Sequence, residues 1–113
     1  MLKPVIPDYE LTTLIDGEES PGSIRDVDIA RQYGVAPCTV HYQRKRLGLP
    51  SANQRREAAM QAMIAHERRP GFLTDPVLAQ KLGIREWGAR QMRRRLGIPN
   101  SFERRQAASE GGG

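Results

Sequence analysis

The apolar positions of the chain fall at helical spacing in two separate stretches. Leu11, Leu14 and Ile15 lie at positions i, i+3 and i+4, so their side chains share one face of a helix. The same spacing returns further along the chain at Met60, Met63 and Ile64. Both stretches predict amphipathic helices, and the intervening pattern is helical as well.

These two stretches belong to a repeat with a period of 49 residues. Shifted by that distance, residues 26–35 align with residues 75–84, and residues 44–50 align with residues 93–99, without a gap. The Pro-Gly pair that begins at Pro21 falls on a second Pro-Gly pair in the same shift. Because register is kept over so many positions, the chain contains two copies of one module.

Each module is predicted to contain three helices. In the first module, the first helix ends at the Pro-Gly pair, and the second begins with Asp26 as its N-cap and stops at Gly34. In the second module, the corresponding signals are Asp75 and Gly83. The third helices are expected over residues 37–47 and 86–96.

Two capping boxes predict the helices that follow. The segment Ser51-Ala52-Asn53-Gln54 has the spacing in which the first and fourth side chains satisfy each other's backbone amides, and residues 100–103 repeat it. We therefore expect a long helix over residues 52–68 and a short one over residues 101–109.

The predicted fold class is all-α. Two tandem three-helix modules, residues 8–56 and 57–109, share the long connecting helix, and the short helix closes the chain. Residues 110–113 are interpreted as a flexible tail. Tyr9, Tyr33 and Phe72 are interpreted as core residues, while Trp87 fits a small core or an exposed contact equally well.

Charge is divided unevenly along the chain. The sequence holds 18 Lys and Arg against 13 Asp and Glu, a net charge of +5. Residues 1–28 contain two basic and seven acidic side chains, a net charge of −5, and residues 29–113 contain 16 basic and six acidic ones, a net charge of +10. The basic region suits a polyanionic partner.

Several function classes find no support in the sequence. Cys38 is the only cysteine, so no intrachain disulfide can form, and with only His41 and His66 beside it no familiar zinc site can be assembled. No nucleophile–base pair or phosphate-binding glycine loop is recognisable. We expect no cofactor, no metal and no enzymatic activity. Without a signal peptide or membrane span in the sequence, a soluble cytoplasmic protein is expected.

The centre of each module has the residue pattern of two helices crossed through a tight turn. Ala30 is small enough for close helix crossing, Gly34 four residues later allows a positive φ, and Val35 and Val40 fill the space between the helices. The second copy repeats this pattern with Ala79, Gly83, Ile84 and Ala89. The pattern resembles the helix-turn-helix family of bacterial and phage DNA-binding proteins, over residues 26–48 and 75–97.

Two departures from that family stand out. The family usually has an apolar residue where this chain has Gln43, and Gly88 with Ala89 weakens the third helix of the second module. One copy could therefore be structural while the other reads DNA.

The resemblance implies that the third helix of each module enters a major groove. Base contacts are then expected from Pro37, Cys38, His41, Tyr42, Arg85, Trp87, Arg90 and Gln91. Phosphate contacts are expected from Thr39, Arg44, Lys45, Arg46, Arg55, Arg56, Arg93, Arg94, Arg95, Arg104 and Arg105. Arg90 could pair guanine and Gln91 adenine in bidentate fashion.

The function predicted on this basis is sequence-specific binding of double-stranded DNA by a covalent pseudo-dimer, as in a transcriptional regulator of a bacterium, phage or plasmid. The two copies differ at their exposed positions, so the preferred site should be asymmetric, with half-sites about 10 bp apart. Two alternatives stay open: a protein-binding inhibitor or adaptor that reuses the fold, and the DNA-targeting part of a terminase-like or integrase-like assembly. The sequence leaves the protein partner and the oligomeric state open.

Overall fold

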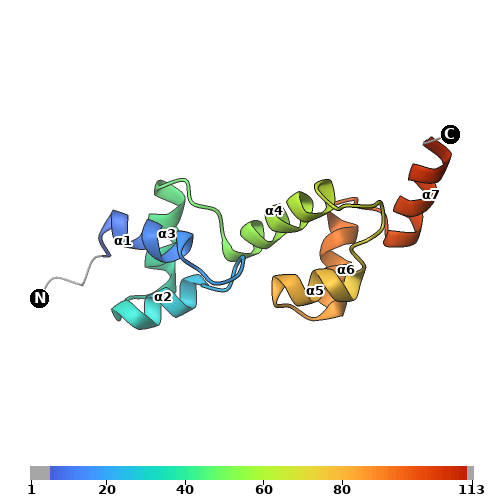
Figure 1. Ribbon diagram of the computed structural model, residues 1–113. Coiled ribbons are helices and arrows are strands. Elements are labelled where there is room, and N and C mark those ends of the chain that lie inside the picture. Colours follow the sequence, from blue (N-terminus) through green and yellow to red (C-terminus); the bar gives the residue numbers. More distant parts are fainter. Residues whose placement is uncertain (1–5, 112–113) are drawn as a thin grey trace, which may run out of the picture. The chain divides into compact units, whose positions relative to one another are not determined.

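The computed structural model describes residues 6–111, and these residues form seven α-helices and no strand (Figure 1). The helices are α1 (Asp8–Asp16), α2 (Asp26–Tyr33), α3 (Pro37–Arg46), α4 (Ala52–Ala65), α5 (Asp75–Leu82), α6 (Glu86–Arg95) and α7 (Ser101–Gly111). The predicted all-α class is confirmed. The chain divides between Arg56 and Glu57 into two compact units, here called unit 1 and unit 2.

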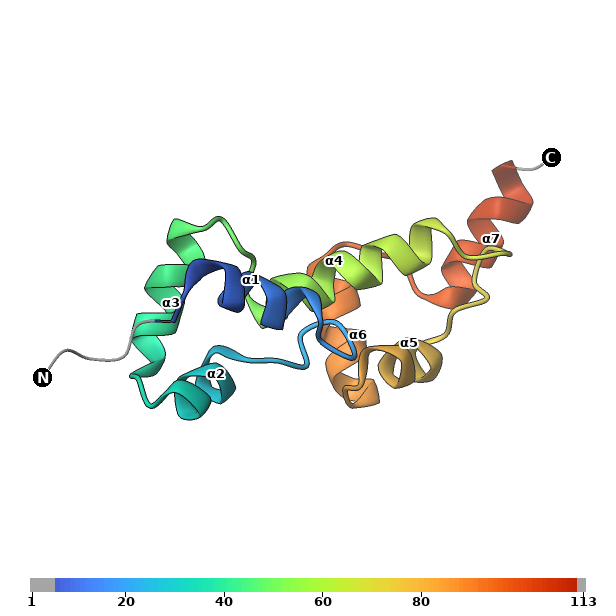
Figure 2. The same cartoon turned by 60° about the vertical axis from the view of Figure 1, so that its left-hand side comes forward.

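Unit 1 has a small apolar core between α1, α2 and α3. Leu11 and Ile15 of α1, Ile29 of α2 and Val40 of α3 are all buried, and Ile6 before α1 joins them. Helix α2 packs against α3 through a connection of only three residues, which begins at a left-handed glycine (Figure 2). This core fixes which face of α3 stays exposed.

Unit 2 repeats that arrangement with α4, α5 and α6. Met60 of α4, Leu78 and Leu82 of α5, and Met92 of α6 are buried in one cluster. The turn between α5 and α6 begins at Gly83, whose φ of 67° equals that of Gly34 in unit 1. Glycine adopts this left-handed backbone without the steric cost of a Cβ. The sequence repeat is thus also a repeat of backbone conformation.

Both capping boxes are present. Ser51 Oγ accepts from the Gln54 amide at 3.1 Å, while Gln54 Oε1 accepts from the Ser51 amide at 2.8 Å. Asn100 and Glu103 repeat this exchange at the start of α7. One box starts the helix that follows α3 and the other starts the helix that follows α6, as the sequence predicted.

Other predicted helix boundaries are wrong. Asp26 and Asp75 are first helical residues, and the N-cap positions belong to Arg25 and Thr74. The two aspartate carboxylates bind the buried Arg44 and Arg93. Helix α1 ends at Asp16 and α4 at Ala65, before the Pro-Gly pairs. The glycine of the first pair, Gly22, is buried, and a Cβ there would clash with the Ala52 carbonyl oxygen. These glycines permit close packing and do not end the helices.

Two predicted core aromatics are exposed. Tyr9 is 72% exposed and Phe72 is 58% exposed, whereas Tyr33 packs against the core of unit 1 and donates its hydroxyl to Glu10. Trp87 is also exposed, at 69%. Of the predicted tail, Glu110 and Gly111 are the last residues of α7, and the rest lies outside the described residues.

Candidate nucleic-acid interface

A buried ion pair fixes each third helix against the helix before it. In unit 1, Arg44 of α3 bonds Asp26 of α2 through Nε at 3.1 Å, and it donates through Nη1 to the Leu49 carbonyl. In unit 2, Arg93 bonds Asp75 at 2.9 Å and the Ile98 carbonyl at 2.9 Å. Both arginines are buried, so their predicted phosphate contacts are corrected to a structural role.

A second buried ion pair ties the helix after each third helix to the loop upstream of α2 or α5. Arg55 bonds Glu18 at 2.8 Å in unit 1, and Arg104 bonds Glu67 at 2.9 Å in unit 2. At most a tenth of each of these four side chains is exposed. Arg55 and Arg104 are therefore not available to phosphate either, and that prediction is likewise corrected.

The two glutamates in these pairs have shifted pKa values. Burial by itself raises the pKa of Glu67, but hydrogen bonds from Arg104 and from the Gly71 and Leu73 amides outweigh it, so that the pKa is lowered. The pKa of Glu18 is lowered by the same balance, with Arg55, Gly22 and Ile24 as donors. Both carboxylates remain charged and act as structural anchors for the loops.

Three further predicted phosphate ligands also have intramolecular partners, but none is buried. Arg46 reaches Asp8 at 2.7 Å, and Arg95 reaches Glu57, yet their side chains stay 62% and 55% exposed. Arg56 is half-buried and donates to the Gly22 carbonyl at 2.8 Å. Exposed pairs of this kind contribute little to stability, so Arg46 and Arg95 can still turn toward a polyanion.

The exposed face of α3 carries little charge. Pro37, Cys38, Thr39 and Tyr42 are exposed. Near the end of the helix Lys45 is also exposed, and it has no ion-pair partner among residues 6–111, whereas Arg46 is paired with Asp8. His41 is half-buried, and its Nδ1 lies 3.0 Å from Arg44 Nη2. The predicted residues of α3 thus form a surface whose main chemistry is hydroxyl, thiol and ring edge.

The exposed face of α6 is basic. Trp87, Arg90, Gln91 and Arg94 are all exposed, and Arg85 lies exposed at the N-cap position. Arg90 is held by Glu86 at 3.5 Å and by Asp75 at 3.6 Å, with 45% of its side chain exposed. The opposite side of α6, Ala89 and Met92, is buried. The helix therefore separates a packing face from a face rich in hydrogen-bond donors.

No family model, curated protein or solved structure matches the chain. Within the described residues, no helix is long and apolar enough to cross a membrane.

The structure also explains a residue that departs from the expected pattern. Gln43 is buried in the place that Met92 takes in unit 2, and its amide donates to the Ile6 carbonyl at 2.6 Å and to Asp8 Oδ1 at 2.9 Å. In unit 2 the residue equivalent to Ile6 lies inside α4, where its carbonyl has helical partners. Gln43 thus serves the chain segment before α1, a role that the sequence pattern alone did not reveal.

Proposed function

We propose that the protein binds double-stranded DNA sequence-specifically, as a tandem helix-turn-helix protein in which α3 and α6 enter the major groove. The observation that carries this proposal is the two-sided character of α6. One side packs on α5, and the other exposes Arg90, Gln91 and Arg94. The helix follows a short turn that begins at the left-handed Gly83. That combination of scaffold and donor-rich face suits an element that reads base edges.

The chemistry of α6 supports recognition of specific bases. A guanidinium at Arg90 can donate two hydrogen bonds to guanine O6 and N7, and the amide at Gln91 can make a bidentate pair with adenine. Trp87 offers apolar contact, for which the thymine methyl group is the major-groove partner.

Phosphate contacts are then expected from the cations that remain exposed. These are Lys45, Arg46, Arg94, Arg95 and Arg105, with Thr39 as an uncharged donor. Such contacts position the protein on the duplex and give affinity a strong dependence on salt.

Unit 2 is expected to supply most of the affinity. Its residues carry ten basic and six acidic side chains, while residues 1–56 carry eight and seven. Because α3 and α6 expose different side chains, the preferred site should be asymmetric. A regulator of transcription is the role that fits this mode of binding.

Selection of bound sequences from a random duplex pool tests the proposal. The full-length protein should enrich a discrete motif, and Arg90→Ala should relax the preference at one position, at a cost of about 1–3 kcal/mol in discrimination. Arg69→Ala is the matched control, because Arg69 is exposed in the α4–α5 connection of the same unit. Enrichment of no motif would refute specific recognition, and an unchanged motif with Arg90→Ala would refute the assignment of α6.

A further inference from the structure

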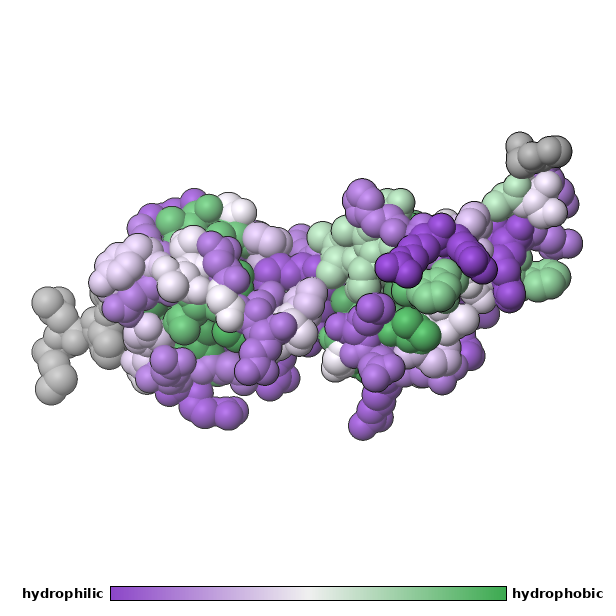
Figure 3. Space-filling view, viewed as in Figure 1, coloured by the Kyte–Doolittle hydropathy of each residue, from purple (hydrophilic) through white to green (hydrophobic). Residues whose placement is uncertain are grey.

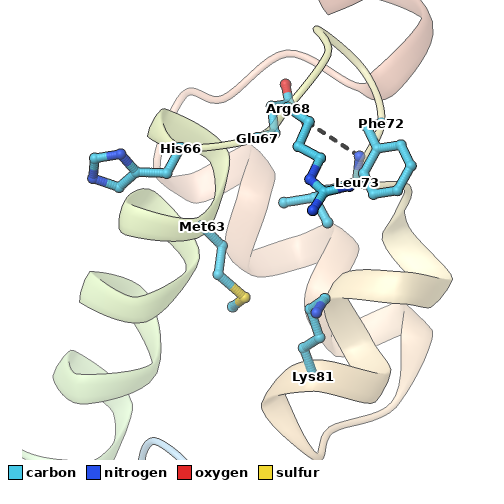
Figure 4. A pocket seen from close by; sticks show the side chains of 7 residues that line it. All are labelled: Met63, His66, Glu67, Arg68, Phe72, Leu73 and Lys81. Atoms are coloured by element: carbon cyan, nitrogen blue, oxygen red, sulfur yellow. Dashed lines mark hydrogen bonds between the residues drawn. The ribbon is translucent and has the colours of Figure 1, made fainter.

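Unit 2 has a surface hollow between α4, α5 and the loop that joins them. Its volume is about 290 Å³. Figure 4 shows Met63 on one side of it and Phe72 on the other. Leu73 forms part of the same apolar lining. Over these elements, green apolar residues lie beside deep purple hydrophilic ones (Figure 3). The hollow is large enough to receive one bulky side chain.

The rim of this hollow is positively charged. Arg68 and Lys81 border it, and both are exposed without an acidic partner among residues 6–111. Glu67 also lines the hollow, but its charge is compensated by Arg104. The uncompensated charge at the rim is therefore positive, which favours an acidic occupant.

The equivalent surface of unit 1 has the opposite charge. The positions of Arg68, Phe72 and Lys81 are occupied there by Glu19, Ser23 and Gln32. The buried glutamate–arginine pair next to them is kept in both units. The buried pair is thus common to both units, while the exposed residues around it are basic or aromatic in unit 2 and acidic or uncharged in unit 1.

Unit 1 also exposes an aromatic side chain on the outer face of α1. Tyr9, Thr13 and Asp16 lie at i, i+4 and i+7, which is one helical stripe, and all three are exposed. Glu19 is exposed just beyond the helix, and neither Asp16 nor Glu19 has a cationic partner in the described part of the chain. The stripe itself combines a bulky anchor with the carboxylate of Asp16, and Glu19 adds a second carboxylate in the loop that follows.

We propose that the hollow of unit 2 binds the Tyr9–Asp16 stripe of α1 from a second copy of the chain. The Tyr9 ring would occupy the hollow against Phe72 and Met63, and Asp16 and Glu19 would face Arg68 and Lys81. An amphipathic helix laid on an apolar groove is a common mode of recognition. Each copy carries both surfaces, so any two copies can make the contact.

The association should be weak and sensitive to salt. A stable interface buries about 800 Å² on each partner, more than one hollow and its rim provide, and exposed charge pairs are screened at high ionic strength. Sedimentation velocity on the full chain, without DNA, should therefore show dimers at low salt and monomers at about 1 M salt, where the Debye length is about 3 Å.

Charge reversal gives a sharper test. The variants Arg68→Glu/Lys81→Glu and Asp16→Arg/Glu19→Arg should each be monomeric at low salt, because one surface now repels the other. An equimolar mixture of the two should associate again, because every contact then joins opposite charges. Tyr9→Ala should weaken dimerisation without changing the net charge.

The matched control reverses two exposed arginines of α6 and its N-cap, which do not line the hollow. Arg85→Glu/Arg94→Glu changes the charge equally and should still dimerise, while circular dichroism verifies that every variant keeps its helix content. A monomeric wild type, a dimeric charge-reversal variant or a mixture that stays monomeric would each overturn the proposal. So would a loss of DNA binding by Arg68→Glu/Lys81→Glu with association unchanged, since the hollow would then serve nucleic acid. Because the assay contains no DNA, its outcome is independent of the proposed DNA-binding function.

Discussion

The buried carboxylate of Glu67 holds three parts of unit 2 together, and removing its charge should destabilise the unit strongly. It accepts hydrogen bonds from the Gly71 and Leu73 amides at 3.0 and 3.1 Å and from Arg104 Nε at 2.9 Å. Only 7% of the Glu67 side chain and 9% of the Arg104 side chain are exposed. Glu67→Gln would leave the Arg104 guanidinium buried without a counter-charge.

Breaking one partner of a buried pair costs about 3–5 kcal/mol. The total stability of a domain is about 5–15 kcal/mol, and units as small as this one lie at the low end. A loss of 3 kcal/mol corresponds to a fall of about 12 °C or more in the midpoint of thermal unfolding.

Thermal unfolding followed by far-ultraviolet circular dichroism, which reports the helix content, measures the effect. Glu110→Gln is the matched control, because it removes the same charge from an exposed position of α7 and should change stability by less than about 0.5 kcal/mol. If Glu67→Gln lowered the stability by no more than the control, the pair with Arg104 would not have the structural role assigned to it.

Three further predictions concern the glutamates Glu18 and Glu67, then Gln43, and then Arg94. The pKa values of Glu18 and Glu67 are lower in the folded protein than in the unfolded chain, so the two carboxylates stabilise the fold above the unfolded pKa near 4.5. This stabilisation is lost as the pH falls through the lower pKa values of the folded protein. The unfolding midpoint measured against pH should show the loss, and the double variant Glu18→Gln/Glu67→Gln, as the control, should not. Gln43→Met leaves the Ile6 carbonyl without its donor and should cost about 1–3 kcal/mol in chemical denaturation, whereas an unchanged stability would contradict the assigned role. Arg94→Ala should reduce the slope of log K against log salt for DNA binding by about 0.9, in an anisotropy titration, and a slope equal to that of the wild type would exclude a phosphate contact.

Local signals in the sequence were sufficient for the helical elements. The apolar spacing at Leu11 and Ile15, the glycine at the α2–α3 turn and the capping box at Ser51 each act through neighbouring residues, so that the pattern contains the cause. All-helical structure and most helix limits could be predicted for that reason.

The roles of the arginines could not be predicted in this way. Arg44 and Lys45 are adjacent in one basic cluster, yet Arg44 is buried on Asp26 while Lys45 is exposed. Only the three-dimensional arrangement places an acid 18 residues away beside one of them. The sequence did contain one signal for these contacts. Asp26 with Arg44, and Glu18 with Arg55, recur at the same spacing in the second copy, and an acid and a base kept together in both copies indicate a contact.

Helix α4 belongs to both units, and this sharing determines how the chain can be divided. Its first turn contributes Arg55 to the loop contacts of unit 1, and its remainder contributes Met60 to the core of unit 2. Helix α7 supplies only the first of these, since Ser109 stands where α4 has Met60. Cleavage between Arg56 and Glu57 would therefore split one helix and damage both units. Excision of residues 1–49, by contrast, would leave α4, α5, α6 and α7, which contain the core of unit 2 and its closing helix.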